Sequence, residues 1–268
     1  MALAAQTLEH EARRRNEPEM RSNNRTAAEL RPIRFQLDYL DFADGSALVE
    51  CGKTRVVAAA TIEDKVPPFL RGSGGGWVTA EYAMLPRSTE KRTQRERQQG
   101  YPSGRSQEIQ RLIGRTLRAV TDLRSLGERQ IIVDCDVIQA DGGTRVASIN
   151  AACVALALAL KKMMDRKIVD QMPLRHLVGA ISVGMVREEL LLDLDYDEDS
   201  TADVDMNVVQ TDRGQLLEVQ ATAERSPFSR HQLTELLKLA DQGIREIVQI
   251  QKDILKRKSL LFMAYGER

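Results

Sequence analysis

A short turn between an expected strand and an expected helix carries residues suited to binding an anion. Its sequence is Gly142-Gly143-Thr144-Arg145. Helix N-termini present unpaired N–H groups and a partial positive charge. The glycines let the backbone approach a ligand closely, while Thr144 offers a hydroxyl and Arg145 a planar guanidinium. These groups suit a phosphate-sized anion, although such a tetrapeptide taken alone is more often a tight turn with a solvated arginine.

Acidic residues crowd into a second segment, residues 193–205. Uncompensated carboxylates repel one another, so they are either exposed to water or held by a cation. Closely spaced oxygen ligands suit Mg²⁺ or Mn²⁺, and the sequence leaves both interpretations open. The seven acids are Asp193, Asp195, Asp197, Glu198, Asp199, Asp203 and Asp205.

A third segment, residues 87–105, is basic and lies in a longer region rich in proline and glycine. Long loops inside a compact domain are often functional. The whole chain is neutral, with 39 basic and 39 acidic residues, so this local cluster favours contact with a polyanion over a solvated surface loop. Arg105 also begins the next expected helix, which makes it a second candidate anion ligand. The basic residues of the segment are Arg87, Lys91, Arg92, Arg95, Arg97 and Arg105.

Hydrophobic patterns indicate which elements position these segments. Residues 131–138 follow the period of two that is typical of a strand, and the apolar run over residues 147–160 predicts a buried helix. The glycine turn therefore lies where a strand ends and a helix begins. Residues 106–120 carry an apolar stripe at helical spacing, so Arg105 is expected at a helix N-terminus.

The remaining patterns alternate between strands and helices, which gives an α/β (α+β) fold without an internal repeat or an obvious linker. Strands are predicted over residues 77–84, 177–183 and 190–196, hairpins over 46–61 and 206–223, and a long helix after its cap Ser229.

Length and composition limit the class of protein. The chain has 268 residues, 42% hydrophobic and 29% charged, as expected of one large globular domain or two small ones. Its cysteines, Cys51, Cys135 and Cys153, are predicted to be reduced core residues, because no zinc-binding spacing is present. We expect no membrane span or secretory signal. Residues 1 to about 30 are predicted to be a mobile arm.

Six segments in order resemble the ribonuclease PH family, phosphorolytic 3′-exoribonucleases that trim transfer-RNA precursors. The resemblance covers residues 20–254, with small departures at Val146, where threonine is usual, and at Asn150. The matching text is ECGKTRVVAAATIEDKVPPFLRG, GWVTAEYAMLPRSTEKR, SGRSQEIQRLIGRTLRAVTDL, VDCDVIQADGGTRVASI, EDSTADVDMNVV and LEVQATAE.

The resemblance implies a ribosomal protein S5 domain 2-like fold, with a single ribonuclease PH domain over residues 20–256, a flexible arm over 1–19 and a tail over 257–268. It implies a cytoplasmic homohexamer built as a trimer of dimers. It also implies a divalent metal, Mg²⁺ or Mn²⁺, at Asp199 and Asp205, and RNA contacts from the loop that holds Arg87, Lys91, Arg92, Arg95 and Arg97. Inorganic phosphate, the co-substrate, would be held by Arg105, Gly143, Thr144 and Arg145.

The activity implied is phosphorolysis of RNA 3′ ends, above all those of tRNA precursors, with release of nucleoside diphosphates and a reversible nucleotidyl transfer. Either carboxyl of the pair could protonate the leaving 3′ oxygen, Asp205 more readily than Asp199. One rival is a non-catalytic RNA-binding ring subunit of an exosome-like complex, which would have lost Arg145 or the acid pair. Another is a metal-dependent hydrolytic nuclease, which would not need the glycine turn.

Overall fold

Two β-sheets pack against one central helix. The computed structural model describes residues 21 and 24–261. The first sheet has the strand order β1-β2-β3-β5-β4. Its strands pair antiparallel except β4 and β5, which run parallel. The strands are β1 (Ile33–Leu37), β2 (Gly45–Cys51), β3 (Thr54–Glu63), β4 (Trp77–Met84) and β5 (Gln130–Gln139).

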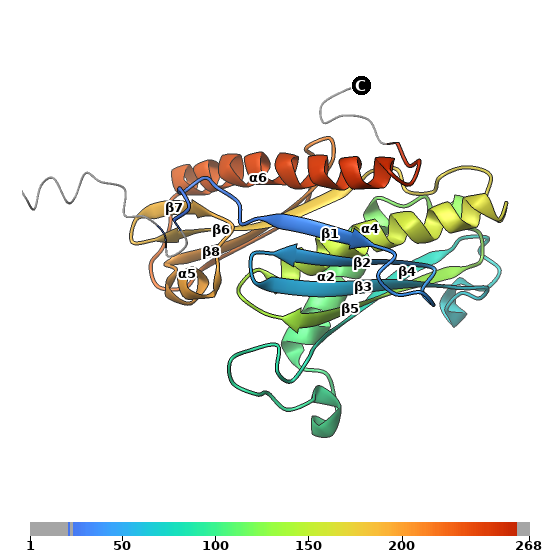
Figure 1. The fold of residues 1–268 in the computed structure, drawn as a ribbon, viewed down its shortest axis with the longest axis horizontal. Helices are drawn as coiled ribbons and strands as arrows, with labels where there is room; N and C mark the ends of the chain where they lie inside the picture. Colours follow the sequence, from blue (N-terminus) through green and yellow to red (C-terminus); the bar gives the residue numbers. More distant parts are fainter. Residues whose placement is uncertain (1–20, 22–23, 262–268) are drawn as a thin grey trace, which may run out of the picture.

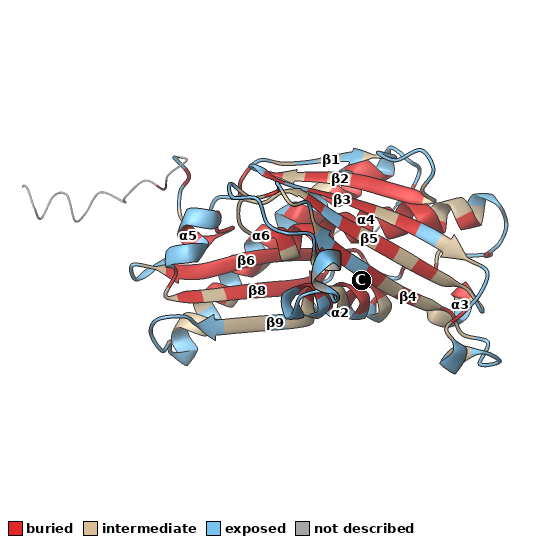
Figure 2. Ribbon diagram, turned by 90° about the horizontal axis from the view of Figure 1, so that it is seen from below, coloured by how far each residue is buried: buried red, intermediate tan, exposed pale blue. Residues whose placement is uncertain are grey.

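The second sheet is antiparallel throughout and has the order β7-β6-β8-β9. Figure 1 shows it lying beside the first sheet, with the long helix α6 along one face. The inner strands are the buried ones in Figure 2, whereas β9 at the edge is largely half-buried or exposed. The strands are β6 (Val178–Val186), β7 (Glu189–Leu192), β8 (Val204–Thr211) and β9 (Leu216–Ala223).

Helix α4 (Thr144–Asp165) packs against both sheets, and nearly all of its residues are buried. It is long and apolar enough to cross a membrane by length and composition, but 89% of its most apolar window is buried inside the protein, as in a core helix. The other helices are α2 (Gly104–Ala119), α3 (Leu123–Leu126), α5 (Tyr196–Thr201) and α6 (Arg230–Lys256), with 3₁₀ turns η1 (Pro68–Leu70) and η2 (Glu96–Gln99).

The predicted elements are confirmed with one exception, the segment after β7. Residues 190–196 were expected to form one strand, but β7 ends at Leu192 and Asp193 adopts a left-handed backbone with φ 57°. Asp195 then caps α5 in a capping box with Glu198, in which each side chain accepts from the other residue's backbone N–H. This capping energy, together with the turn at Asp193, outweighs the alternating pattern.

The mobile arm predicted for residues 1 to about 30 is corrected in its second half. The arm over residues 1–19 lies outside the described residues, but Arg21 and Arg25 are 7% and 5% exposed, so they belong to the folded body. At the other end, Leu260 is buried although it lies in the predicted tail, and residues 262–268 are not described. The three cysteines are free and buried, as predicted.

Candidate active site

The glycine turn lies at the start of α4, as the sequence predicts. Gly142 and Gly143 both have positive φ, 74° and 67°, and Gly143 is the N-cap residue. No side chain caps the helix, so the amides of its first turn are left for another partner. We call residues 140–145 the anion loop. It presents the polar groups that bind phosphate at helix N-termini in other proteins.

The two side chains of the anion loop are held by neighbours that the sequence did not single out. Thr144 Oγ1 lies 3.0 Å from the hydroxyl of Tyr82, which comes from β4. Arg145 donates from Nη1 to Gln220 Oε1 at 2.7 Å and forms an ion pair with Glu108 at 2.7 Å. Its Nε is buried and has no acceptor among the described residues. An unsatisfied donor of this kind is what an arriving anion would engage.

Arg105 is the second residue of α2 and is exposed. Its charge acts on both sides of the site. Burial raises the pKa of Tyr82, and the bond to Thr144 and the charges of Arg105 and Arg145 oppose that rise. Desolvation raises the pKa of Asp199, and the charge of Arg105 is the strongest influence against it. Arg105 is therefore close enough to act electrostatically on both Tyr82, which binds Thr144 of the anion loop, and Asp199 of the acid pair.

The acid pair consists of Asp199 on α5 and Asp205 on β8. Burial raises the pKa of Asp205 to about 6, and the negative charge of Asp199 adds to the rise. The positive charge of Arg145 opposes this rise in the pKa, so the ionisation of Asp205 depends on the anion loop as well as on Asp199. Glu224 also raises the pKa of both aspartates. The structure thus brings together Arg105, Arg145, Asp199 and Asp205, which lie far apart in the sequence.

Two mutually repelling carboxylates fit a divalent cation, because its charge would relieve their repulsion. Among residues 21 and 24–261, no group of three or more histidine, cysteine, aspartate or glutamate side chains is arranged as a metal cage. Mg²⁺ does not need one, since it commonly binds one or two carboxylates and takes its other ligands from water and substrate phosphates. Asp199 and Asp205 therefore fit a metal that is shared with the substrate.

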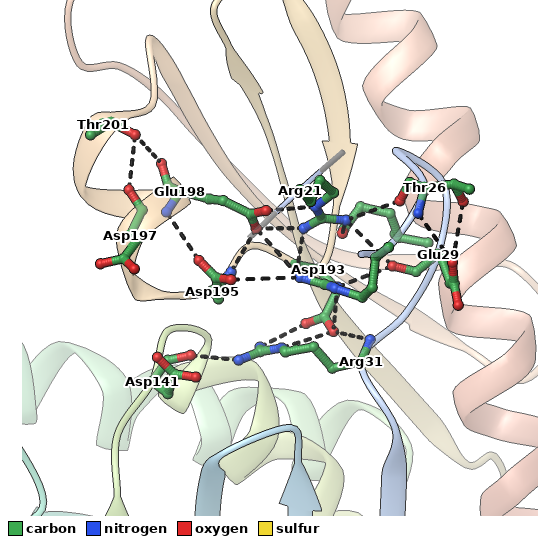
Figure 3. Close-up of polar contacts among 12 residues, drawn as sticks. Arg21, Thr26, Glu29, Arg31, Asp141, Asp193, Asp195, Asp197, Glu198 and Thr201 are labelled. Carbon is green, nitrogen blue, oxygen red and sulfur yellow. Dashed lines mark hydrogen bonds and ion pairs between the residues drawn. The ribbon is translucent and has the colours of Figure 1, made fainter. Parts of the chain in front are cut away.

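Of the five remaining acids in residues 193–205, three are paired with arginines, whereas Asp197 is exposed and Asp203 is half-buried. Asp193, Asp195 and Glu198 are buried and form ion pairs with arginines before β1 (Figure 3). These three acids are therefore neither solvated nor available to a metal. Charge spacing alone does not distinguish these three acids from the other four, because their arginine partners lie far away in the sequence. These partners are Arg21, Arg25 and Arg31.

The basic loop connects β4 to α2 and extends away from the body of the molecule (Figure 1). Its base is tied to α2 by Glu96, whose carboxylate accepts from Ser103 and Ser106 at 2.8 and 2.6 Å. The loop thus places a group of positive charges near Arg105, while their contact with RNA stays a prediction. Arg87, Lys91, Arg92 and Arg95 are exposed, and the side chain of Arg97 is not described.

The site residues that sequence reasoning missed are Tyr82, Glu108 and Gln220. Tyr82 follows the ordinary alternation of a strand, and Glu108 sits on the polar face of an ordinary amphipathic helix. No local pattern distinguishes them. Only the packing of β4, α2 and β9 around the anion loop gives them a role.

Sequence comparisons identify the family. Residues 29–162 match domain 1 and residues 176–243 match domain 2 of the 3′ exoribonuclease family. The chain is 56% identical to ribonuclease PH of Moorella thermoacetica over 236 residues, which cover 88% of this chain and 94% of the relative. It is also 56% identical to ribonuclease PH of Solibacter usitatus over 237 residues, 88% of this chain and 100% of the relative.

Solved structures support the fold. The crystal structure of rice Rrp46 is similar with a TM-score of 0.71 at 21% identity, covering 88% of this chain and all (100%) of that one. An Archaeoglobus fulgidus exosome with RNA bound to the active site is similar with a TM-score of 0.72 at 22% identity, covering 92% and 94% of the two chains. The first family region supplies the anion loop and the second the acid pair. The chain belongs to the ribonuclease PH family of phosphorolytic 3′ exoribonucleases.

Proposed function

We propose that the anion loop and Arg105 bind inorganic phosphate, and that the acid pair acts on the last phosphodiester of a tRNA precursor or another RNA 3′ end. The observation that carries this proposal is that the anion loop packs at Gly142 against the backbone of Leu194 and Asp195, directly before the helix that holds Asp199, and that Arg105 and Arg145 both act on the acid pair electrostatically. Phosphorolysis needs two things: a binding site for the phosphate nucleophile, and next to it a group that stabilises the negative charge of the reacting phosphodiester. A hydrolytic nuclease would need only the second.

In the proposed reaction, Thr144, Arg145, Arg105 and the first amides of α4 orient phosphate for in-line attack on the terminal phosphodiester. The new P–O bond forms as the bond to the 3′ oxygen of the preceding nucleotide breaks. The terminal nucleotide leaves as a nucleoside diphosphate, and the shortened RNA regains a 3′ hydroxyl. The reverse reaction adds a nucleotide from a diphosphate and releases phosphate.

The negative charge on the transferring phosphoryl group must be stabilised in the transition state. We infer that Asp199 and Asp205 hold Mg²⁺ or Mn²⁺, which when bound would neutralise part of that charge. One carboxyl of the pair can also supply the proton that the departing 3′ oxygen takes up. Either Asp199 or Asp205 could supply this proton.

We further propose that the basic loop contacts the phosphates of the RNA body and that the active form is a cytoplasmic homohexamer, a trimer of dimers. The Archaeoglobus fulgidus exosome, which has a similar fold, has RNA bound to its active site, and this supports an RNA substrate. The loop extends from the body, so one subunit alone is poorly shaped to surround a strand. A ring would bring several such loops around the same RNA.

The test is to incubate the full-length protein with a 3′-extended tRNA while varying phosphate. We expect nucleoside diphosphates whose yield depends on phosphate. Arg145→Ala should reduce kcat/KM for phosphate by roughly 10- to 100-fold, because a charge-assisted hydrogen bond contributes about 1.5–3 kcal/mol. Arg115→Ala removes a half-exposed arginine on α2 and is the matched control.

Three outcomes would contradict the proposal. Nucleoside monophosphates formed without phosphate would indicate hydrolysis. RNA binding without any turnover would favour a non-catalytic ring subunit of an exosome-like complex. A fully active monomer in light scattering would refute the hexamer and leave the chemistry intact.

A further inference from the structure

Arg31 contacts both segments that carry the proposed site. It lies just before β1, and its side chain is 3% exposed. Its backbone N–H, Nε and Nη2 donate to the carboxylate of Asp193 at 2.8, 3.0 and 2.7 Å. Its Nη1 donates to the backbone carbonyl of Asp141. Figure 3 shows the guanidinium lying between these two acceptors, which it therefore holds together.

The two acceptors belong to different halves of the site. Asp141 lies in the anion loop, directly before Gly142. Asp193 follows β7 and precedes α5, the helix that carries Asp199. One arginine side chain therefore connects the segment proposed to hold phosphate with the segment that presents Asp199 of the acid pair.

The same segments also touch backbone to backbone. A Cβ added at Gly142 would lie 2.6 Å from the carbonyl carbon of Asp195 and 2.7 Å from the carbonyl oxygen of Leu194. No side chain fits between them, so the position of one backbone determines that of the other. The Arg31 guanidinium lies beside this contact. A Cβ added at the neighbouring Gly143 would lie 3.1 Å from Nη2 of Arg31.

The conformation of Asp193 depends on this arginine. Its carboxylate is 0% exposed and its backbone has φ 57°, an unusual value for a residue other than glycine. A buried carboxylate is costly unless it is paired and hydrogen-bonded. Arg31 supplies three hydrogen bonds to this carboxylate and Arg25 a longer ion pair at 3.5 Å, so losing the Arg31 fork would weaken the turn that leads into α5.

We propose that Arg31 is a positioning residue for the phosphorolytic reaction, one that fixes the anion loop at a constant separation from the acid pair. A guanidinium can donate to Asp193 and to the Asp141 carbonyl at once because its donors form a planar fork. A lysine ammonium carries the same charge but cannot reproduce that fork. The inference rests on the proposed function, which gives the two segments their roles.

Arg21 provides a matched control in the same cluster. Its side chain is also 3% exposed and forms an ion pair with Glu198. Its further acceptors are backbone carbonyls of residues 26, 29, 192 and 193. Arg21 thus binds the acid segment as Arg31 does, but its described acceptors do not include the anion loop. Arg21→Lys therefore measures the effect of disturbing the ion pairs of the acid segment without disturbing a contact to the anion loop.

The experiment compares Arg31→Lys with Arg21→Lys in the full-length chain by hydrogen exchange and by steady-state kinetics. We expect Arg31→Lys to accelerate exchange in peptides covering both 139–146 and 193–201. It should also raise KM for phosphate about 10-fold or more, since small misplacements of reacting groups can cost up to ~100-fold. Arg21→Lys should accelerate exchange only around 193–201 and leave KM for phosphate within about 3-fold of wild type.

Wild-type exchange in 139–146 together with wild-type KM in Arg31→Lys would overturn the proposal, and so would equal changes in the two lysine variants. If Arg31→Lys does not fold, Asp193→Asn weakens the same link from its other end and must also accelerate exchange in 139–146. Unchanged exchange there would be equally decisive against a positioning role. Exchange does not depend on turnover, so a wild-type enzyme that released monophosphates would refute phosphorolysis without altering this result.

Discussion

The hydroxyl of Tyr82 lies 3.0 Å from Thr144 Oγ1, and the Tyr82 side chain is almost fully buried, with 2% exposure. Each hydroxyl has one proton to donate. If Thr144 donates its proton to a bound phosphate, Tyr82 must donate to Thr144. The Tyr82 hydroxyl would then orient the threonine hydroxyl toward the anion.

Tyr82→Phe should therefore weaken phosphate binding and leave RNA binding unchanged. A neutral hydrogen bond contributes about 0.5–1.5 kcal/mol, which corresponds to a roughly 2- to 10-fold rise in KM for phosphate. Tyr39→Phe, a partly exposed tyrosine before β2, is the control. An unchanged KM in Tyr82→Phe would mean that Thr144 does not rely on Tyr82 to orient its proton.

The basic loop should contribute to RNA binding through phosphates rather than bases. Replacing Arg92 and Arg95 with alanine should lower the slope of log affinity against log salt by about 1.4, since each lost contact to a single strand accounts for ~0.7. Filter binding at several salt concentrations measures the slope. The control is Lys238→Ala with Arg245→Ala, which changes two exposed cations on α6. Equal slopes in wild type and the loop variant would remove the loop from the RNA contact.

Asp205→Asn should have the opposite effect. It removes a carboxylate from the acid pair, so single turnover at saturating RNA and phosphate should slow by ~100-fold or more, as expected when a charged group acts on the transition state. RNA affinity should hold or increase, because one negative charge no longer repels the backbone. Asp203→Asn, a neighbouring aspartate outside the pair, is the control. Normal turnover in Asp205→Asn would show that the acidic site lies elsewhere.

The ion pair between Asp193 and Arg31 should make the free energy of unfolding decrease at acid pH. Burial raises the pKa of Asp193, but the charge and hydrogen bonds of Arg31 outweigh burial, and the pKa is lowered overall. A group with a depressed folded pKa stabilises the protein above its unfolded pKa, about 3.9, and loses that contribution as the pH falls through the folded value. At neutral pH, Asp193→Asn should reduce the free energy of unfolding by ~3–5 kcal/mol, because it leaves a buried charge without its partner.

Urea unfolding of wild type and Asp193→Asn between pH 7 and pH 3 measures this effect. The difference between the two proteins should stay constant down to about pH 4 and shrink below it. A difference that did not change with pH would mean that the pKa of Asp193 is the same in the folded and unfolded states, and a difference that grew as the pH fell would mean that Asp193 is protonated in the folded state.

Much of the fold could be predicted from the sequence because the signals are local. The hairpin of β2 and β3 turns at Gly52, where φ is 56°, and a glycine between two alternating runs predicts such a turn. Ser229 caps α6 with a capping box that a short motif predicts. The anion loop was also found from local features, namely two glycines between an alternating strand and an apolar run.

What could not be predicted depends on contacts between distant segments. The carboxylates of Asp193 and Asp199 look alike in the sequence, yet one is buried against Arg31 and the other belongs to the acid pair. Similarly, Glu108 and Gln220 reach Arg145 only because α2 and β9 meet beside α4. The family resemblance separated Asp199 and Asp205 from the other acids, which charge counting did not achieve.

The contact at Gly142 makes the smallest residue of the loop a spacer between the two family domains. In the proposed reaction, the first domain would bind the phosphate nucleophile and the second would act on the phosphodiester, and at Gly142 the two domains meet through backbone atoms. One added methyl group at Gly142 would clash with the backbone of residues 194–196 and push the anion loop away from the segment that leads into α5. A side chain at this position should therefore lower both the rate of RNA trimming and the stability of the fold, because the backbone φ of 74° also disfavours any residue other than glycine.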